Sequence, residues 1–174
     1  ITLDEELATL VGYYTAEGYT REKMDDRVEG EHRGSTHTDF AATEEKAREF
    51  IQETLQKKFN VENPYVNETR ITASGNIVRF FFKDILDSGK YAHTKEVPEQ
   101  IKNGNDQIKG GYLSGYISGD GTILSSRLRM STVSSKLHKQ VCNLFGEMGY
   151  DTTSRKRDPV PLKQKFPDYY DEDD

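Results

Sequence analysis

The stretch GYLSGYISGDG, residues 111–121, repeats the design of ATLVGYYTAEG, residues 8–18, which lies 103 positions earlier. Small residues recur at every fourth position in both, at Ala8, Gly12 and Ala16 and again at Gly111, Gly115 and Gly119. Positions four apart lie on one face of a helix, so each stretch predicts a helix with a ridge of small side chains. Two such ridges let helix axes approach more closely than the usual roughly 8–10 Å. We therefore expect these two helices to pack against each other.

An acidic residue ends each of these stretches. Glu17 is followed by Gly18, and Asp120 is followed by Gly121, where a left-handed turn is expected to end the helix. A helix C-terminus carries about half a negative charge, and two neighbouring carboxylates repel each other. The sequence therefore predicts a positive partner at this point, and a divalent cation with oxygen ligands is the simplest one.

Composition indicates a polar globular protein. The chain has 174 residues, 33% of them hydrophobic and 31% charged, which suits one domain or two small pseudo-equivalent halves. No apolar run of about 18 residues and no basic-then-apolar leader is found, so we expect no membrane span and a cytoplasmic, intracellular location. The single cysteine, Cys142, excludes a disulfide framework and a zinc site by count and predicts a small core residue.

The net charge of −6 argues at first against a nucleic-acid partner, because phosphate contacts require Lys and Arg. Five of the 30 acids lie in the tail 168–174, and the remaining 25 nearly balance the 24 basic residues. An acidic surface with one basic strip and an adaptation to high salt both fit this distribution. The charge alone does not choose between them.

The order of predicted elements repeats after each motif. In the first half we expect a helix over 3–17, a polar hairpin over 19–40, a helix over 44–59, strands over 64–73 and 76–82, and a short helix from 83. In the second half we expect strands over 122–124 and 127–132, a helix over 134–148 and a strand over 150–157. The predicted segments are a first half (1–108), an incomplete second half (109–158) and an acidic, disordered tail (159–174).

The motifs LVGYYTAEG (10–18) and LSGYISGDG (113–121) resemble the paired motifs of LAGLIDADG homing endonucleases. The ending AEG of the first motif, DGTI after the second and the phrase KEVP (95–98) are most similar to the endonuclease domains of archaeal inteins. The resemblance covers roughly residues 5–157. It implies an α+β fold: a saddle of two pseudo-two-fold related αββαββα units, the second apparently truncated here, with antiparallel sheets lining the DNA major groove.

The resemblance also implies a chemistry. The chain would act as a monomer, since both motifs lie in it, and make a staggered double-strand break at a long, specific site in double-stranded DNA near the nucleoid. Glu17 and Asp120, with the preceding Ala16 and Gly119, would hold Mg²⁺, for which Mn²⁺ can substitute. Such ions polarise the phosphate, lower the pKa of a bound water and stabilise the leaving oxygen.

The chain departs from the family pattern at positions that bear on DNA cleavage and at its two ends, which bear on splicing. Many relatives carry Lys or Gln after the second strand of each unit, where this chain has Ala41-Ala42 and Thr132-Val133. Lys83, expected at the end of the strand IVRFFFK, is therefore our candidate catalytic lysine, weighed evenly against a solvated strand end. Ile1 and Asp174 stand where an intein requires a nucleophile and a terminal asparagine, so we expect no splicing by this chain alone.

Basic side chains on the predicted strands are candidates for DNA contact, because Arg suits phosphate and guanine. An exposed strand arginine without any such role is about equally common. The candidates are Arg33, His37, Arg70, Arg79, Arg127, Arg129, Arg155 and Arg157. Two alternatives to a nuclease remain at this point: a LAGLIDADG-derived DNA-binding module that is weak or inactive in cleavage, and a structural domain without nucleic acid.

Overall fold

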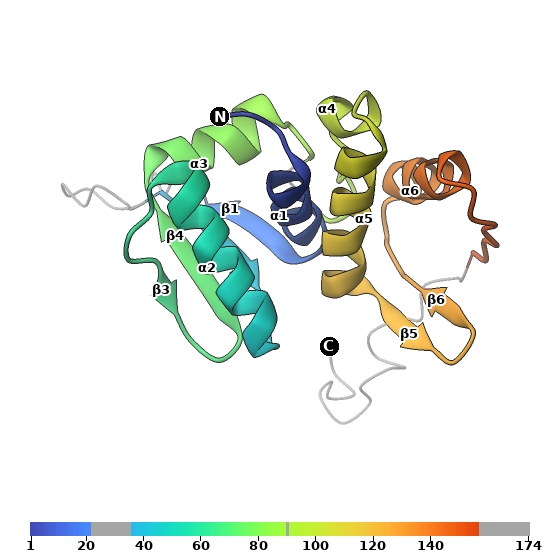
Figure 1. The fold of residues 1–174 in the computed structure, drawn as a ribbon, viewed down its shortest axis with the longest axis horizontal. Coiled ribbons are helices and arrows are strands. Elements are labelled where there is room, and N and C mark those ends of the chain that lie inside the picture. The colour runs from blue at the N-terminus through green and yellow to red at the C-terminus, as the bar shows by residue number, and fades with distance from the viewer. Residues whose placement is uncertain (22–35, 90, 157–174) are drawn as a thin grey trace, which may run out of the picture.

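The computed structural model describes residues 1–21, 36–89 and 91–156 (Figure 1). Its elements follow in the order α1 (Glu5–Glu17), β1 (Gly18–Arg21), β2 (His37–Ala41), α2 (Glu45–Phe59), β3 (Tyr65–Val66), β4 (Arg70–Ser74), α3 (Asn76–Phe80), the π-helical turn η1 (Phe81–Ile85), α4 (Glu99–Lys102), α5 (Asp106–Asp120), β5 (Thr122–Leu124), β6 (Arg127–Arg129) and α6 (Ser135–Glu147). The expected α+β class is confirmed. No helix among the described residues is both long and apolar enough to cross a membrane.

The two motif helices, α1 and α5, lie side by side at the centre of the molecule (Figure 1). A Cβ atom on Gly12 would lie 2.1 Å from the carbonyl oxygen of Tyr112, and one on Gly115 would lie 1.9 Å from that of Thr9. Real Cβ atoms do not come so close to a backbone oxygen, so only glycine permits this contact. The predicted packing of the two small-residue ridges is therefore confirmed.

The first half contains a four-stranded antiparallel sheet with strand order β1-β2-β4-β3. One face of this sheet is buried, and it presents Thr20, Thr38, Phe40, Ile71 and Ala73 to the core. Because side chains alternate along a strand, the residues between these point to the opposite, open face.

Aromatic rings fill the space between the buried face of the sheet and the helices. Tyr14 of α1 packs on Phe82 of η1 with ring centroids 4.3 Å apart, and Phe40 of β2 meets Phe82 at 5.4 Å in an edge-on arrangement. Offset and edge-to-face pairs of this kind add to the stabilisation from burial. They fix the end of α1 relative to the sheet.

The strand predicted over 76–82 is wrong, because these residues begin a helical segment. After Gly75, at φ +131°, the buried positions are Val78, Phe81, Phe82 and Leu86, which follows helical rather than alternating spacing. The strand predicted over 64–73 is instead a short hairpin of β3 and β4. Short apolar runs do not distinguish a strand from a buried helix, and IVRFFF is such a run.

The second half is smaller than the first. It contains α5, the two-stranded hairpin β5-β6 and α6. The strand predicted over 150–157 is wrong as far as the structure describes it, because residues 150–156 have no regular secondary structure. Residue 157 lies outside the described residues. Ser134 caps α6, its hydroxyl accepting a hydrogen bond from the backbone N–H of Leu137 at 3.1 Å.

Both motif helices end in the same way, and not by the left-handed turn that was expected. Gly18 and Gly121 each have φ −88° and ψ 151°, and each N–H bonds to the carbonyl four residues back. A Cβ atom would lie 2.5 Å from the Tyr14 oxygen at the first position and 2.3 Å from the Ile117 oxygen at the second. Glycine is therefore required here by close contact rather than by its dihedral angles.

Candidate metal centre and nucleic-acid interface

The close packing of α1 and α5 brings their terminal acids together. Gly119 lies against Ala16 at the last shared turn, where an added Cβ would come within 2.5 Å of the Ala16 methyl group and 3.8 Å of Cγ of Glu17. The carboxyl group of Glu17 interacts with that of Asp120, and this interaction is one of the causes that raise the pKa of Asp120. The two predicted acids thus form one site.

The surroundings of the Asp120 carboxyl group disfavour its charged form. Burial, the contact with Glu17 and the charge of Glu17 together raise the pKa of Asp120 to about 6, against the lowering effect of Lys95. A carboxyl group that is hard to ionise in the folded protein gains most from a cation, because the cation neutralises the charge where it develops.

Lys95 lies at this site, and sequence reasoning did not select it. Its ammonium group donates hydrogen bonds to the carbonyl oxygens of Ala16 and Gly18, both at 3.2 Å, and of Tyr14 at 3.4 Å. These carbonyls form the C-terminal end of α1, where a cation is favoured. Burial lowers the pKa of Lys95, while the charges of Asp120 and Glu17 act to raise it. A positive group therefore does sit beside the two acids, as a lysine.

The segment around Lys95 is held firmly in place. The Ser134 hydroxyl donates to the Lys95 carbonyl at 2.6 Å, and the N–H of Val97 donates to the Gln140 side-chain oxygen at 2.8 Å. Val97 itself is fully buried. The second half thus positions the lysine that reaches the first motif helix. The phrase KEVP marked this segment in the sequence, but nothing local in it revealed the direction of the lysine.

The residues present fit a hard divalent cation. Two carboxylates meet at the site, and no group of three or more His, Cys, Asp or Glu side chains that could hold a metal is found among the described residues. A cation here would take its remaining ligands from backbone oxygen, water or a phosphate, which Mg²⁺ commonly does. Of the two residues expected to hold the metal together with the acids, Ala16 already accepts a hydrogen bond from Lys95 at its carbonyl oxygen. The other, Gly119, is in direct contact with Ala16.

Lys83 does not lie where the predicted strand would have placed it. It belongs to η1, and its ammonium lies 4.0 Å from the Asp84 carboxylate. The positions that carry Lys or Gln in many relatives differ in burial: Ala42 is buried, whereas Val133 is 73% exposed.

The open face of the four-stranded sheet carries two of the predicted DNA-binding residues. His37 and Arg70 both approach Asp39, at 3.5 and 3.9 Å. Arg21, which sequence reasoning did not select, pairs with His37 in the register of β1 and β2 and is exposed. The alternation in GYTR directly after the first motif was the signal that identifies it.

The other predicted DNA-binding residues are dispersed. Arg127 and Arg129 lie exposed at either end of β6, on one face of that strand. Arg79 lies in α3 instead of a strand and pairs with Asp84 at 3.5 Å. Arg155 is exposed in the irregular segment that follows α6, and Arg33 and Arg157 lie outside the described residues.

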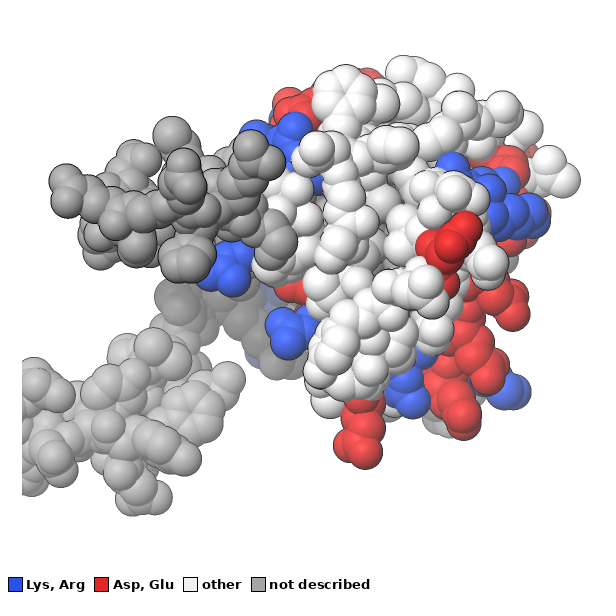
Figure 2. Space-filling view, turned by 90° about the vertical axis from the view of Figure 1, so that its left-hand side faces the viewer, with Lys and Arg blue, Asp and Glu red and all other residues white. Residues whose placement is uncertain are grey.

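Among the described residues, no single basic patch dominates the side of the molecule that carries α3 and β3. Figure 2 shows charges of both signs around a broad uncharged area on that side. This mixed distribution agrees with the near balance of acids and bases outside the tail. Attraction to DNA would therefore depend on individual basic residues of the sheet surfaces rather than on the net charge.

Comparison with known proteins gives the same resemblance as the two motifs. Residues 107–170 match the family model of the LAGLIDADG-like domain. The solved structure of I-DmoI in complex with DNA and Mn superposes on 90% of this chain and 85% of that one, with a TM-score of 0.66 and 14% sequence identity. The I-DmoI complex with DNA and Ca gives a TM-score of 0.61, covering 86% of this chain and 74% of that one at 14% identity. The predicted resemblance to LAGLIDADG homing endonucleases is confirmed.

Relatives by sequence are archaeal. The chain is 29% identical over 153 residues to the DNA polymerase II large subunit of Thermococcus kodakarensis, covering 84% of this chain and 8% of that protein. It is 27% identical to an uncharacterised protein of Methanocaldococcus jannaschii, with 90% and 18% covered. It is 28% identical to the ATP-dependent DNA helicase Hel308 of Thermococcus kodakarensis, with 88% and 14% covered. The chain thus spans less than a fifth of the length of these relatives, which agrees with the predicted similarity to domains embedded in inteins.

Proposed function

We propose that this chain is a metal-dependent DNA endonuclease of the LAGLIDADG type that makes a staggered double-strand break at a long target site. The observation that carries the proposal is the pair of carboxyl groups, Glu17 and Asp120, held together by glycine-mediated helix packing. Both acids come from one chain, which supports action as a monomer. The DNA complexes of structurally similar I-DmoI support double-stranded DNA as the substrate.

Each group of the site has a role in this proposal. Glu17 and Asp120 would hold Mg²⁺ or Mn²⁺ near the scissile phosphates. A bound ion of this kind would lower the pKa of a bound water and stabilise the leaving oxygen. Lys95 holds the end of α1 and places a positive charge beside both acids, where negative charge develops on phosphate. We therefore assign to Lys95 the role of catalytic lysine that the sequence predicted for Lys83.

The proposed surface for DNA is the open face of the two sheets. Arg21, His37 and Arg70 would contact DNA from the first sheet, and Arg127 and Arg129 would do so from β6. These groups would supply phosphate contacts that position the duplex over the acids, and contacts to base edges that specify the site.

Plasmid cleavage tests the proposal. Supercoiled plasmids carrying gene segments of the archaeal polymerases and helicase that the chain resembles would be incubated with the protein and Mg²⁺, Mn²⁺ or EDTA. We expect one defined linear product that requires the metal and is lost in Asp120→Asn. Asp106→Asn is the matched control, because Asp106 is an exposed residue at the opposite end of the same helix.

A second candidate function is a DNA-binding module without cleavage. It is favoured by Ala42 and Val133, which lack the polar groups that many relatives have at these positions. Specific binding with no metal-dependent product would establish this alternative and exclude the nuclease. Absence of binding at every salt concentration would exclude both.

A further inference from the structure

One acidic side chain lies in the middle of the open face of the first sheet. Asp39 of β2 is paired with Tyr19 of β1 on one side and with Thr72 of β4 on the other. Thr72 is paired in turn with Tyr65 of β3, so these residues form a row across the whole sheet. The tyrosines at the two ends of the row are both exposed. Asp39 therefore lies on the face that is proposed to contact DNA, among candidate contacts that are otherwise basic.

The neighbours of Asp39 hold its carboxylate in place and leave one oxygen without a hydrogen bond. Oδ1 accepts a hydrogen bond from the Thr72 hydroxyl. Oδ2 lies 3.5 Å from Nε2 of His37 and 3.9 Å from the Arg70 guanidinium, farther than the roughly 2.7–3.2 Å of a hydrogen bond. Within the part of the chain that the structure describes, no hydrogen bond to Oδ2 is found. Because the side chain is 15% exposed, a donor must reach this oxygen from the open face.

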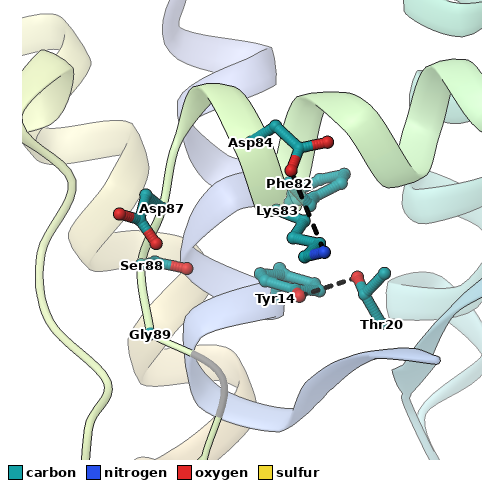
Figure 3. A pocket seen from close by; sticks show the side chains of 8 residues that line it. All are labelled: Tyr14, Thr20, Phe82, Lys83, Asp84, Asp87, Ser88 and Gly89. Carbon is teal, nitrogen blue, oxygen red and sulfur yellow. Dashed lines mark hydrogen bonds and ion pairs between the residues drawn. The ribbon is translucent and has the colours of Figure 1, made fainter. Parts of the chain in front are cut away.

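Polar groups on the buried face of the same sheet are paired with one another. The Tyr14 hydroxyl lies 2.8 Å from that of Thr20 (Figure 3), which lies 3.3 Å from that of Thr38. These hydroxyl groups satisfy each other inside the fold, as buried polar groups normally do. The acceptor left at Asp39, in contrast, is on the face where a ligand has access.

The charge of Asp39 restricts what it can contact on DNA. A carboxylate only accepts hydrogen bonds, and the phosphates of DNA repel it. The donors in the major groove are the amino groups of cytosine and adenine. Adenine also presents its N7 acceptor beside the amino group, and this acceptor would face a carboxylate oxygen. Cytosine presents its amino group without such an acceptor on the same base, so cytosine is the base that suits Asp39 best.

The basic neighbours of Asp39 make this contact compatible with DNA binding. Arg70 is exposed, and His37 lies two positions from Asp39 on the same face of β2. Their positive charges offset the repulsion between the carboxylate and the phosphates. Asp39 in turn lowers the affinity of this face for DNA in general. It discriminates between bases because a base without a donor would leave the carboxylate desolvated and unpaired.

We propose that Asp39 is a specificity-determining residue, whose Oδ2 accepts a hydrogen bond from the amino group of a cytosine in the major groove of the target. The inference rests on the proposed function for the binding of double-stranded DNA and not for its cleavage. It assigns one C·G base pair to the half of the target that the first sheet contacts.

Selection of bound duplexes from a random double-stranded DNA library tests the proposal. The full chain would be used with Ca²⁺, the ion in one of the I-DmoI complexes with DNA. We expect the wild type to enrich a site with cytosine at one position, and Asp39→Asn to enrich adenine there, because Asn pairs with both N6 and N7 of adenine. Asp39→Asn also keeps the acceptor for the Thr72 hydroxyl. Asp106→Asn removes the same charge from the start of α5 and should keep cytosine.

Fluorescence anisotropy on the enriched duplex then measures the size of the effect. Replacement of the C·G pair by A·T should weaken binding of the wild type about tenfold and strengthen binding of Asp39→Asn. Asp39→Ala should bind both duplexes equally. A merely structural role of Asp39 would instead weaken binding by the same factor for every base pair.

The same enriched site for wild type and Asp39→Asn, or an equal loss of affinity for every base pair, would overturn the proposal. A wild-type site without a required cytosine would also overturn it, and this result does not depend on the folding of any variant. Absence of any enriched sequence would overturn both the role of Asp39 and the proposed binding of DNA. An enriched site that is not cleaved with Mg²⁺ or Mn²⁺ would overturn the nuclease function and leave the role of Asp39 intact.

Discussion

The ends of the two motif helices share one backbone geometry but differ in their surroundings. Gly18 and Gly121 have the same dihedral angles and the same capping hydrogen bond. At the first end, Glu17 is exposed and Lys95 binds the terminal carbonyls. At the second end, Asp120 is partly buried, and burial is the largest cause of its raised pKa.

This difference shows that pseudo-symmetry of the chain trace does not extend to the chemistry of the site. The repeated sequence places two acids at equivalent points. The non-repeated segment around Lys95 then makes them unequal, because one ammonium group faces both carboxylates from the side of α1. Single substitutions separate the contribution of the shared helices to the site from that of this added lysine.

The largest effect is expected for Lys95→Met. Loss of one preorganised positive group beside the reacting centre typically costs about 10²–10³-fold in rate, and we expect a reduction of that size in plasmid cleavage. Lys83→Met is the matched control and should change the rate less than about threefold. Equal losses in both variants would show that the lysine predicted from the sequence is catalytic after all.

The packing of the two helices should show the next largest effect, on stability. Gly115→Ala forces a methyl group into the Thr9 carbonyl and should lower the free energy of unfolding by about 3 kcal/mol. Gly146→Ala in α6, where a Cβ meets nothing within 4 Å, should instead raise it by about 0.5–1 kcal/mol. Urea denaturation of both variants measures the difference, and a destabilised Gly146→Ala would contradict the structure.

Asp120 should have a smaller effect on stability, and this effect should depend on pH. Its pKa is about 6 in the folded chain against an ordinary 3.8, so the unfolded chain ionises first and stability falls as the pH rises between these values. Asp120→Asn should therefore raise the melting temperature of the metal-free protein at pH 7.5. After allowance for partial exposure we expect about 1 kcal/mol, or roughly 2–4 °C.

The gain from Asp120→Asn should shrink as the pH falls and disappear at about pH 3, below both pKa values, where the wild-type carboxyl is mostly protonated in both states. Added Mg²⁺ should stabilise the wild type and not the variant, because the cation offsets the same charge. A variant that is no more stable than the wild type at pH 7.5 in EDTA would show that Asp120 is not destabilising as an anion.

The smallest effects concern single arginines on the two sheets. Arg127→Ala should weaken DNA binding a few-fold and reduce the slope of log affinity against log salt by about 0.9, the loss of one phosphate contact. Arg70→Ala should change both quantities less, because Asp39 lies 3.9 Å from the Arg70 guanidinium. Fluorescence anisotropy across a salt series compares them, and a larger loss for Arg70→Ala would reverse this ranking.

Sequence reasoning identified the features that are encoded locally. The four-residue spacing of glycine and alanine predicted the α1–α5 contact, and the motif endings predicted the acid pair. The strand assigned to 76–82 failed because an apolar run of this length suits either helix or strand. Lys95 was missed for another reason: its direction depends on contacts with Ser134 and Gln140, about 40 positions further along the chain.

The glycine contacts between α1 and α5 also bear on how the chain folds. They join segments 103 positions apart, so the central contact forms only after a long loop has closed. We expect α2 and the first sheet to gain structure early, and α1 to remain without its buried partner until α5 arrives. A ribosome that has released only the first half would therefore expose the face of α1 that carries Ala8 and Gly12, and a fragment ending before α5 would be prone to aggregation.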